Sequence, residues 1–329
     1  MTSLQTPLCR TLGIDLPLVQ APIGSASTPA LAAAVANAGG LGMLSLTWVP
    51  DAEVRARLLR VRELTSRAFG INLVLEFPVE GKLDACLEAG VRVISTFWGH
   101  PARFHDRIKG AGALHVHTVS SAAEAAAAVD AGVDVIVAQG CEAGGHVRGQ
   151  VPAMVLVPAV VDAARGVPVV AAGGIADGRG LAAALMLGAQ AGWLGTRFLA
   201  AEEAFTHEVY RQQVVAAPET DAVLTLAFDG GWAGAPHRAL RNTTLRAWEG
   251  AGSPASPARP GEGDVVARDE DGGVYLRYGD MMPLPGMTGE LEAMALYAGQ
   301  SAGLVHDIRP AARIVADIAC EAAELLGCP

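Results

Sequence analysis

The feature that most constrains this chain is a repeated alternation of short apolar segments and longer amphipathic stretches over its first 217 residues. Most of these segments are continuous apolar runs, which is typical of parallel strands that are covered on both faces. Eight β/α units in roughly 215 residues predict an α/β protein with a (β/α)₈ TIM barrel, and a doubly wound sheet is the alternative. We expect strands at residues 18–21, 41–45, 69–74, 91–97, 113–118, 133–139, 167–172 and 191–195.

Local signals support helices between these strands. Thr28 before Pro29, Ser121 three residues before Glu124, and Asp177 are expected helix N-caps. Glycine is the residue that most often follows the last turn of a helix. We therefore expect helices to end at Gly39, Gly90, Gly132 and Gly188, each of which precedes an expected strand.

The rhythm stops after Ala217, which divides the chain into a barrel over 1–217 and a C-terminal capping segment over 218–329. Within the capping segment, Gly, Pro and Ser dominate residues 250–263, which predicts a flexible loop. Two apolar runs flank an Asp-Glu-Asp-Gly-Gly turn, which predicts a hairpin. We place the hairpin at 265–268 and 274–278, and helices near 287–299 and 309–326.

Charge and composition exclude several classes of function. The net charge is −10, and 22 of the 24 basic residues are scattered arginines, so we expect no nucleic-acid partner. Residues 16–50 carry no charge, but prolines and a Gly-Gly pair interrupt them, so we expect no membrane span. Five cysteines without a CxxC pair argue against a disulfide framework and a zinc site. The same spacing leads us to expect no bound metal. No apolar segment near the N-terminus could act as a signal peptide, so we expect a cytoplasmic protein.

Glycines stand after the last two expected strands, where barrels commonly bind a phosphate. Gly173 and Gly174 follow the seventh strand, and Gly195 with Thr196 follows the eighth. Glycine lets backbone amides approach a phosphate closely, so these positions predict a phosphate site.

A histidine and a polar strand residue are the candidates for chemistry. His146 ends a Gly-rich segment after the sixth strand and is a candidate general base, although a histidine on a surface loop is the alternative. Cys141 lies five residues before it, and a buried thiol is favoured over a Cys/His nucleophile. Asn72 interrupts an apolar strand and either contacts a ligand or bonds to neighbouring backbone.

Aromatic and further histidine side chains near strand ends form a candidate substrate pocket, with rim packing as the alternative. Trp48, Trp98 and His100 follow the second and fourth strands. His115 and His117 share one face of the fifth strand, and structural roles are favoured for both.

Taken together, these segments resemble the nitronate monooxygenase family over nearly the whole chain. The resemblance implies an FMN-binding TIM barrel, which agrees with the strand count. It is carried by Gln20-Ala-Pro, by residues 31–42, by Gln139-Gly-Cys-Glu-Ala-Gly-Gly-His146, by Ala172-Gly-Gly-Ile-Ala-Asp-Gly178, by Leu194-Gly-Thr-Arg-Phe198 and by Leu296-Tyr-Ala-Gly-Gln300.

The resemblance also implies roles for individual residues. His146 matches the catalytic base, and Tyr297 and Gln300 join the candidate substrate pocket. The residues that would contact FMN are Pro22, Ile23 and Gly24, then Asn72 and Gln139, then Ala143, Gly144 and Gly145, and at the phosphate Gly173, Gly174, Gly195 and Thr196.

The reaction implied is oxidation of an alkyl nitronate, or of the parent nitroalkane, with O₂ to a carbonyl compound and nitrite. The alternative is an FMN-dependent reductase that takes hydride from NAD(P)H to a quinone or an enoyl thioester. A flavin-binding barrel without catalysis is a third possibility, against which His146 argues.

Overall fold

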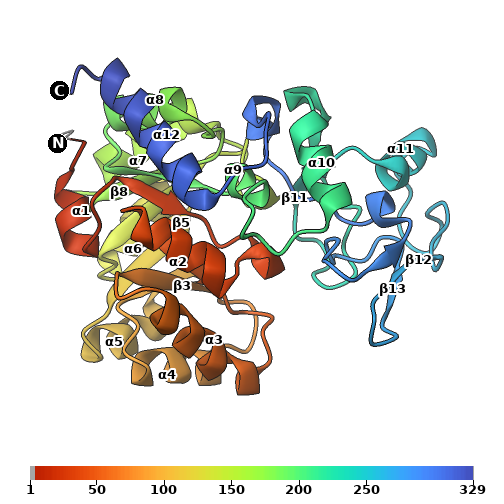
Figure 1. The fold of residues 1–329 in the computed structure, drawn as a ribbon, viewed down its shortest axis with the longest axis horizontal. Coiled ribbons are helices and arrows are strands. Elements are labelled where there is room, and N and C mark those ends of the chain that lie inside the picture. The colour runs from red at the N-terminus through yellow and green to blue at the C-terminus, as the bar shows by residue number, and fades with distance from the viewer. Residues whose placement is uncertain (1–3, 329) are drawn as a thin grey trace.

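The computed structural model describes residues 4–328. Eight parallel strands form one sheet in the order β1-β9-β8-β6-β5-β4-β3-β2, with helices around them (Figure 1). All eight predicted strands are confirmed. Their bounds are β1 Leu18–Gln20, β2 Gly42–Ser45, β3 Phe69–Val74, β4 Val93–Phe97, β5 Leu114–Val119, β6 Val135–Gln139, β8 Val169–Ala172 and β9 Ala191–Leu194.

The two ends of this sheet meet, which makes it a TIM barrel. Leu18 on β1 pairs with Gly192 on β9, and on its other side Val19 forms a parallel bridge to Leu41 just before β2. The amide of Gln20 donates to the carbonyl of Leu41 at 2.9 Å. The carboxyl ends of all eight strands therefore open toward the same face.

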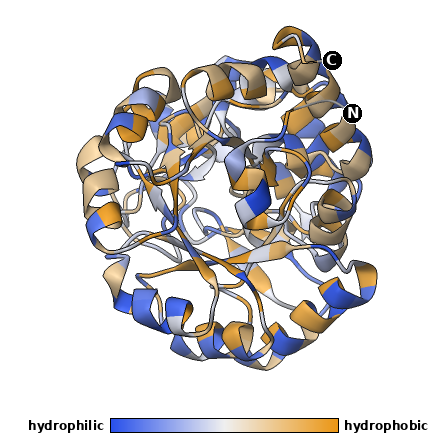
Figure 2. Cartoon of the chain, turned by 90° about the vertical axis from the view of Figure 1, so that its left-hand side faces the viewer, coloured by the Kyte–Doolittle hydropathy of each residue, from blue (hydrophilic) through white to orange (hydrophobic). Residues whose placement is uncertain are grey.

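Helices surround the barrel and turn their apolar sides toward it (Figure 2). The three predicted N-caps are confirmed, because Thr28, Ser121 and Asp177 each accept a backbone amide of the first helical turn. The helices of the barrel layer are α1 Pro7–Leu12, α2 Pro29–Asn37, α3 Asp51–Leu64, α4 Glu80–Glu88, α5 Ala102–Gly110, α6 Ala122–Asp130, α7 Ala153–Ala163, α8 Gly178–Met186 and the short α9 Thr196–Leu199. No helix among the described residues is long and apolar enough to cross a bilayer.

The two faces of β5 separate the barrel interior from the layer beneath the helices. Val116 packs with the interior residues of neighbouring strands. His115 and His117 point the other way, where the hydroxyl of Thr96 contacts His115 Nε2 at 2.8 Å and His117 Nδ1 at 2.7 Å. One hydroxyl has a single proton to donate, so this arrangement suits two neutral imidazoles. Both histidines are part of the buried wall.

Residues beyond the barrel form a separate lobe over its carboxyl-end face and then return. The lobe lies on the right of Figure 1. The predicted hairpin is confirmed as β12 paired with β13. The elements of this region are α10 Glu208–Ala216, β10 Ala222–Thr225, β11 His237–Leu240, α11 Thr243–Gly250, β12 Val265–Arg268, β13 Val274–Leu276, β14 Thr288–Gly289 and the 3₁₀ turns η2 Glu219–Asp221, η3 Leu291–Ala293 and η4 Gln300–Leu304.

The predicted helix over 287–299 is wrong. Strand β14 and the short 3₁₀ turn η3 form there instead, and Tyr297 pairs with Ala239 beside β11. Gly289 has φ +122°, and a Cβ there would lie 2.4 Å from the carbonyl oxygen of Val266. Pairing with neighbouring strands therefore overrides the helical pattern of this segment.

A helix does span α12, Ala311–Leu325, but it does not cap the barrel face. It packs along α8 on the outside of the barrel, and the carboxylate of Glu321 accepts the amide of Gly178 at 2.7 Å. A Cβ on Gly178 would approach the amide of Ala322 to 2.5 Å, so the two helices lie in close backbone contact. The chain thus leaves the barrel after α9, builds the lobe and comes back to the barrel wall.

Candidate active site

A cavity of about 280 Å³ lies at the carboxyl ends of the barrel strands, beneath the lobe. Its wall contains His146 and all twelve residues that the sequence predicts as cofactor contacts. These twelve are Pro22, Ile23, Gly24, Asn72, Gln139, Ala143, Gly144, Gly145, Gly173, Gly174, Gly195 and Thr196. That each of them touches a flavin stays a prediction.

One end of the cavity is lined by glycines in unusual backbone conformations. Gly173 has φ +97° and Gly174 has φ +73°. A Cβ on Gly173 would come within 3.0 Å of the carbonyl oxygen of Gly140. Within residues 4–328, the amides of Gly173 and Gly174 donate to no other residue. Successive free amides of this kind form a concave site that suits an anion such as a phosphate.

Polar side chains stand in the middle of the cavity. Asn72 is buried on β3, and its side chain makes no hydrogen bond to another described residue. Gln139 donates through Nε2 to the carbonyl of His146 at 3.3 Å, while its buried Oε1 has no partner among the described residues. Buried polar groups without protein partners indicate a place where a ligand supplies them.

A two-residue strand holds His146 in place, where the sequence predicts a loop. Strand β7, Gly145–His146, pairs antiparallel with β11, so His146 stands opposite His237. Burial, together with the nearby His237, lowers the pKa of His146 to about 3. Its buried Nε2 has no hydrogen-bond partner in the described part of the chain. The imidazole is therefore neutral at physiological pH, and no other described residue occupies its Nε2. The same burial makes it a weaker base than a free histidine.

Contacts from the C-terminal lobe fix the segment that carries Gln139 and His146. Arg238 on β11 donates from two guanidinium nitrogens to the carbonyl of Cys141. The amide of Gln300 donates to the carbonyl of Glu142 at 2.9 Å. A Cβ on Gly144 would lie 2.4 Å from the amide nitrogen of Gly299, so the two backbones touch. The site is therefore shared between barrel and lobe.

An aromatic cluster covers the side of the cavity next to His146. The ring of Trp232 lies 4.4 Å from the ring of His146, measured between centroids, and 4.6 Å from that of Trp98. Its indole N–H donates to Glu76 at 3.0 Å. This apolar cover shields the imidazole from solvent.

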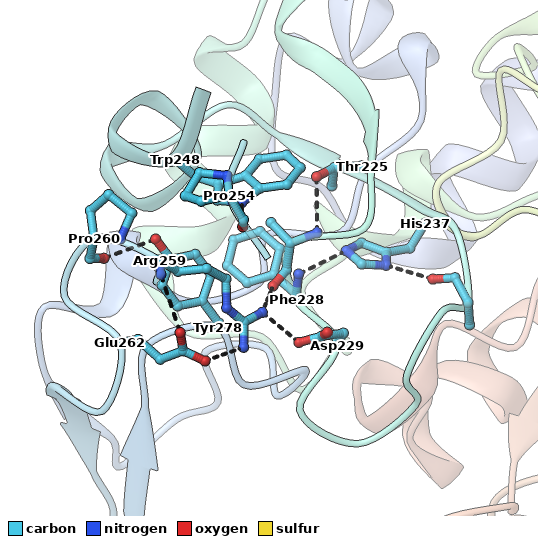
Figure 3. A network of polar contacts seen from close by, with 12 residues as sticks. Thr225, Phe228, Asp229, His237, Trp248, Pro254, Arg259, Pro260, Glu262 and Tyr278 are labelled. Carbon is cyan, nitrogen blue, oxygen red and sulfur yellow. Dashed lines mark hydrogen bonds and ion pairs between the residues drawn. The ribbon is translucent and has the colours of Figure 1, made fainter. Parts of the chain in front are cut away.

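A polar network holds the segment that carries Trp232 (Figure 3). His237 accepts the amide of Phe228 at Nε2 and contacts the carbonyl of Ala235 through Nδ1, so it joins the two ends of this segment. On the outer side, Arg259 binds Asp229 and Glu262, each at 2.6 Å. The position of Trp232 thus depends on the contacts that His237 and Arg259 make within the lobe.

The structure brings only two of the five residues predicted for the substrate pocket to the cavity wall, and their contact with a substrate stays a prediction. Trp48 and Tyr297 line the cavity. Trp98 contacts Trp232 from outside the cavity wall, while the ring of His100 caps the amide of Ala102 on the exterior. The side chain of Gln300 is exposed as well, and only its backbone supports the site. Proximity to a strand end does not determine which way a side chain points.

Further wall residues escaped prediction, and the lobe contributes Trp232, Asp280 and Met282 among them. All three lie in irregular segments of the lobe, far in sequence from the barrel strands. The pair of glycines before Trp232 marks a turn but not its partner. Only the fold brings these residues to the site.

Cys141 is not activated as a nucleophile. Burial and the neighbouring Glu142 carboxylate raise the pKa of its thiol. A nucleophilic cysteine requires a lowered pKa. Its contribution is the backbone carbonyl that Arg238 binds.

The buried histidines make stability depend on pH. Burial lowers the pKa of His115 and His146 to about 3 and that of His117 to about 4, below the ordinary value of 6.5. The unfolded chain therefore binds protons first, and stability that is complete above pH 6.5 is lost as the pH falls. We expect the melting temperature to drop between pH 6.5 and 5, above the range where most carboxylates titrate. Calorimetry at constant ionic strength measures this, and a constant melting temperature over that interval would contradict buried neutral histidines.

Comparison with known proteins agrees with this geometry. FabK from Thermotoga maritima superimposes with a TM-score of 0.82 at 31% identity, over 98% of this chain and 97% of that one. A nitroalkane oxidase from Streptomyces ansochromogenes gives a TM-score of 0.80 at 30% identity, over 97% and 99%. A (3aS,4S,5R,7aS)-5-hydroxy-7a-methyl-1-oxo-octahydro-1H-indene-4-carboxyl-CoA dehydrogenase of Mycobacterium tuberculosis is 36% identical, over 75% of this chain and 69% of its own length.

The barrel, the cavity at its carboxyl-end face and these similarities define a flavin-dependent oxidoreductase. The chain belongs to the nitronate monooxygenase family, whose sequence profile matches residues 5–80 and 76–321. The family resemblance of the sequence motifs is thereby confirmed.

Proposed function

We propose that this protein is an FMN-dependent nitronate monooxygenase that converts nitroalkanes, through their nitronates, to a carbonyl compound and nitrite with O₂. The observation that carries the proposal is the neutral, unpartnered imidazole of His146 on the wall of a cavity with a glycine-lined anion site. The similarity to a nitroalkane oxidase supports the same chemistry.

The residues present fit FMN. The amides of Gly173 and Gly174, with the backbone at Gly195, would hold its phosphate. Thr196 accepts the amide of Gly299 at 2.9 Å, which leaves its hydroxyl proton free to be donated to the same phosphate. Asn72 and Gln139 would meet the polar edge of the ring. When bound, the flavin supplies the electron transfer between the nitronate and O₂.

The chain itself supplies a base and a dry pocket. His146 takes the proton from the carbon next to the nitro group through its Nε2, which has no hydrogen-bond partner among the described residues. The negative charge that develops on the nitronate beside it favours the imidazolium and opposes the effect of burial. The ring of Trp232, whose centroid lies 4.4 Å from that of His146, keeps water away from the imidazole. The two hydrogen bonds from Arg238 to the carbonyl of Cys141 hold the segment from Cys141 to His146 beside β11.

The second candidate is a flavin-dependent dehydrogenase or reductase that acts on a thioester or a quinone. The 36% identity to a carboxyl-CoA dehydrogenase favours this candidate. A thioester carbonyl also acidifies the adjacent carbon, so a base at His146 would suit either substrate.

Anaerobic flavin reduction distinguishes the two candidates. FMN-loaded protein is mixed with NADH, NADPH or an alkyl nitronate without oxygen, and the visible flavin absorbance is followed. We expect bleaching by the nitronate and none by either nicotinamide. Rapid bleaching by NADH or NADPH alone would favour the reductase and lead to assays with quinones and enoyl thioesters.

A further inference from the structure

Among the described residues that line the active-site cavity, Asp280 is the one acidic side chain, and none is a lysine or arginine. It follows the hairpin of the lobe and is only partly exposed. A charged group in such a small, largely apolar site acts on every ligand that enters it, because the low local polarity weakens screening.

The contacts of Asp280 place it near the proposed reacting groups. A Cβ on Gly231 would lie 2.0 Å from Asp280 Oδ2, so the carboxylate packs against the backbone next to Trp232. The hydroxyl of Tyr297 donates to the main-chain oxygen of Asp280 at 3.0 Å. The ring of Tyr297 in turn lies 5.8 Å from that of His146.

In the described part of the chain this carboxylate forms no ion pair and accepts no side-chain hydrogen bond, and only its own backbone amide partly offsets its burial. Burial accordingly raises its pKa. Two arginines line the adjoining cavity with Asp280, and both are already engaged: Arg259 with Asp229 and Glu262, and Arg277 with Glu290 and Asp264.

We propose that Asp280 is a specificity-determining residue that disfavours substrates carrying a carboxylate and favours neutral substrates that present a hydrogen-bond donor. A second anion near Asp280 is repelled, whereas an amide or hydroxyl can donate to its free oxygens. This inference rests on the proposed function for the identity of the reacting group, but the discrimination itself concerns only the remainder of the substrate.

The first test compares 3-nitropropionate with 3-nitropropanamide, which have nearly the same shape and differ in charge. We expect kcat/KM of the wild-type enzyme to favour the amide by roughly tenfold or more. Asp280→Asn should bring the ratio close to one. The control Asp271→Asn removes the same charge from an exposed turn of the lobe outside the cavity wall and should leave the ratio unchanged. An equal ratio in wild type and Asp280→Asn overturns the proposal.

The second test needs no turnover and therefore separates failure of this proposal from failure of the proposed function. Butyrate and butyramide are titrated into the flavin-loaded protein, and the fluorescence of the cavity tryptophans reports binding. We expect tighter binding of butyramide in the wild type and loss of that preference in Asp280→Asn. If nitro compounds are not oxidised, this binding ratio still decides the role of Asp280. Asp280→Ala serves as the smaller neutral variant if the asparagine disturbs Gly231, and an unchanged preference in a folded neutral variant overturns the proposal.

Discussion

Replacing His146 with alanine is expected to lower kcat/KM for a neutral nitroalkane by about 10²- to 10⁴-fold, the usual contribution of a positioned base. The Nε2 of this imidazole has no partner among the described residues and is free to accept the proton. No other side chain on the described cavity wall offers a neutral nitrogen base. Steady-state kinetics with nitroethane measures the loss.

The preformed nitronate is the control for this variant, because it has already lost the proton that His146 would remove. Its oxidation should fall far less than that of the nitroalkane. His306→Ala, which replaces an exposed histidine outside the cavity, should leave both rates unchanged. Equal losses with nitroalkane and nitronate in His146→Ala would contradict the base and indicate a role in binding.

Gly144→Ala is expected to abolish flavin retention and, with it, activity. The new Cβ would lie 2.4 Å from the amide nitrogen of Gly299 and 2.5 Å from the carbonyl carbon of Ala298, and backbone atoms cannot move aside as a side chain can. The segment from Gln139 to His146 must shift instead. Overpacking of this kind costs on the order of 1–3 kcal/mol. The ratio of visible to ultraviolet absorbance reports bound flavin, and thermal unfolding reports stability.

A glycine with free space around it provides the matched control. A Cβ on Gly110, at the end of α5, would meet nothing within 4 Å. Gly110→Ala should therefore keep both flavin and stability. A Gly144→Ala protein that purifies with a full complement of flavin would show that the contact between segment and lobe is dispensable.

The barrel could be predicted because its signals are local. A buried parallel strand needs a continuous apolar run, as at β6, and a helix needs a cap such as Ser121, so each is visible in a few adjacent residues. The cavity residues of the barrel follow from the same logic, because every strand delivers its next residues to one face. Gly173 and Gly195 were thus predictable from their positions alone.

The lobe could not be predicted in the same way, because long-range pairing decides its structure. The segment around Tyr297 has the composition of a helix, but it pairs with β11 instead. Trp232 reaches His146 only through the turn that His237 holds, and Asp280 only through packing against Gly231. Such contacts leave no periodic trace in the sequence.

The return of α12 to the barrel wall has a consequence for how enzymes of this architecture can diverge. Because the chain is anchored on the barrel both before the lobe and after it, the lobe is an insertion whose two ends are fixed. Substitutions in it can reshape the roof above a bound substrate while the floor that would hold the cofactor stays the same. A single inherited barrel can in this way be given new substrates by changes confined to one contiguous stretch of the gene.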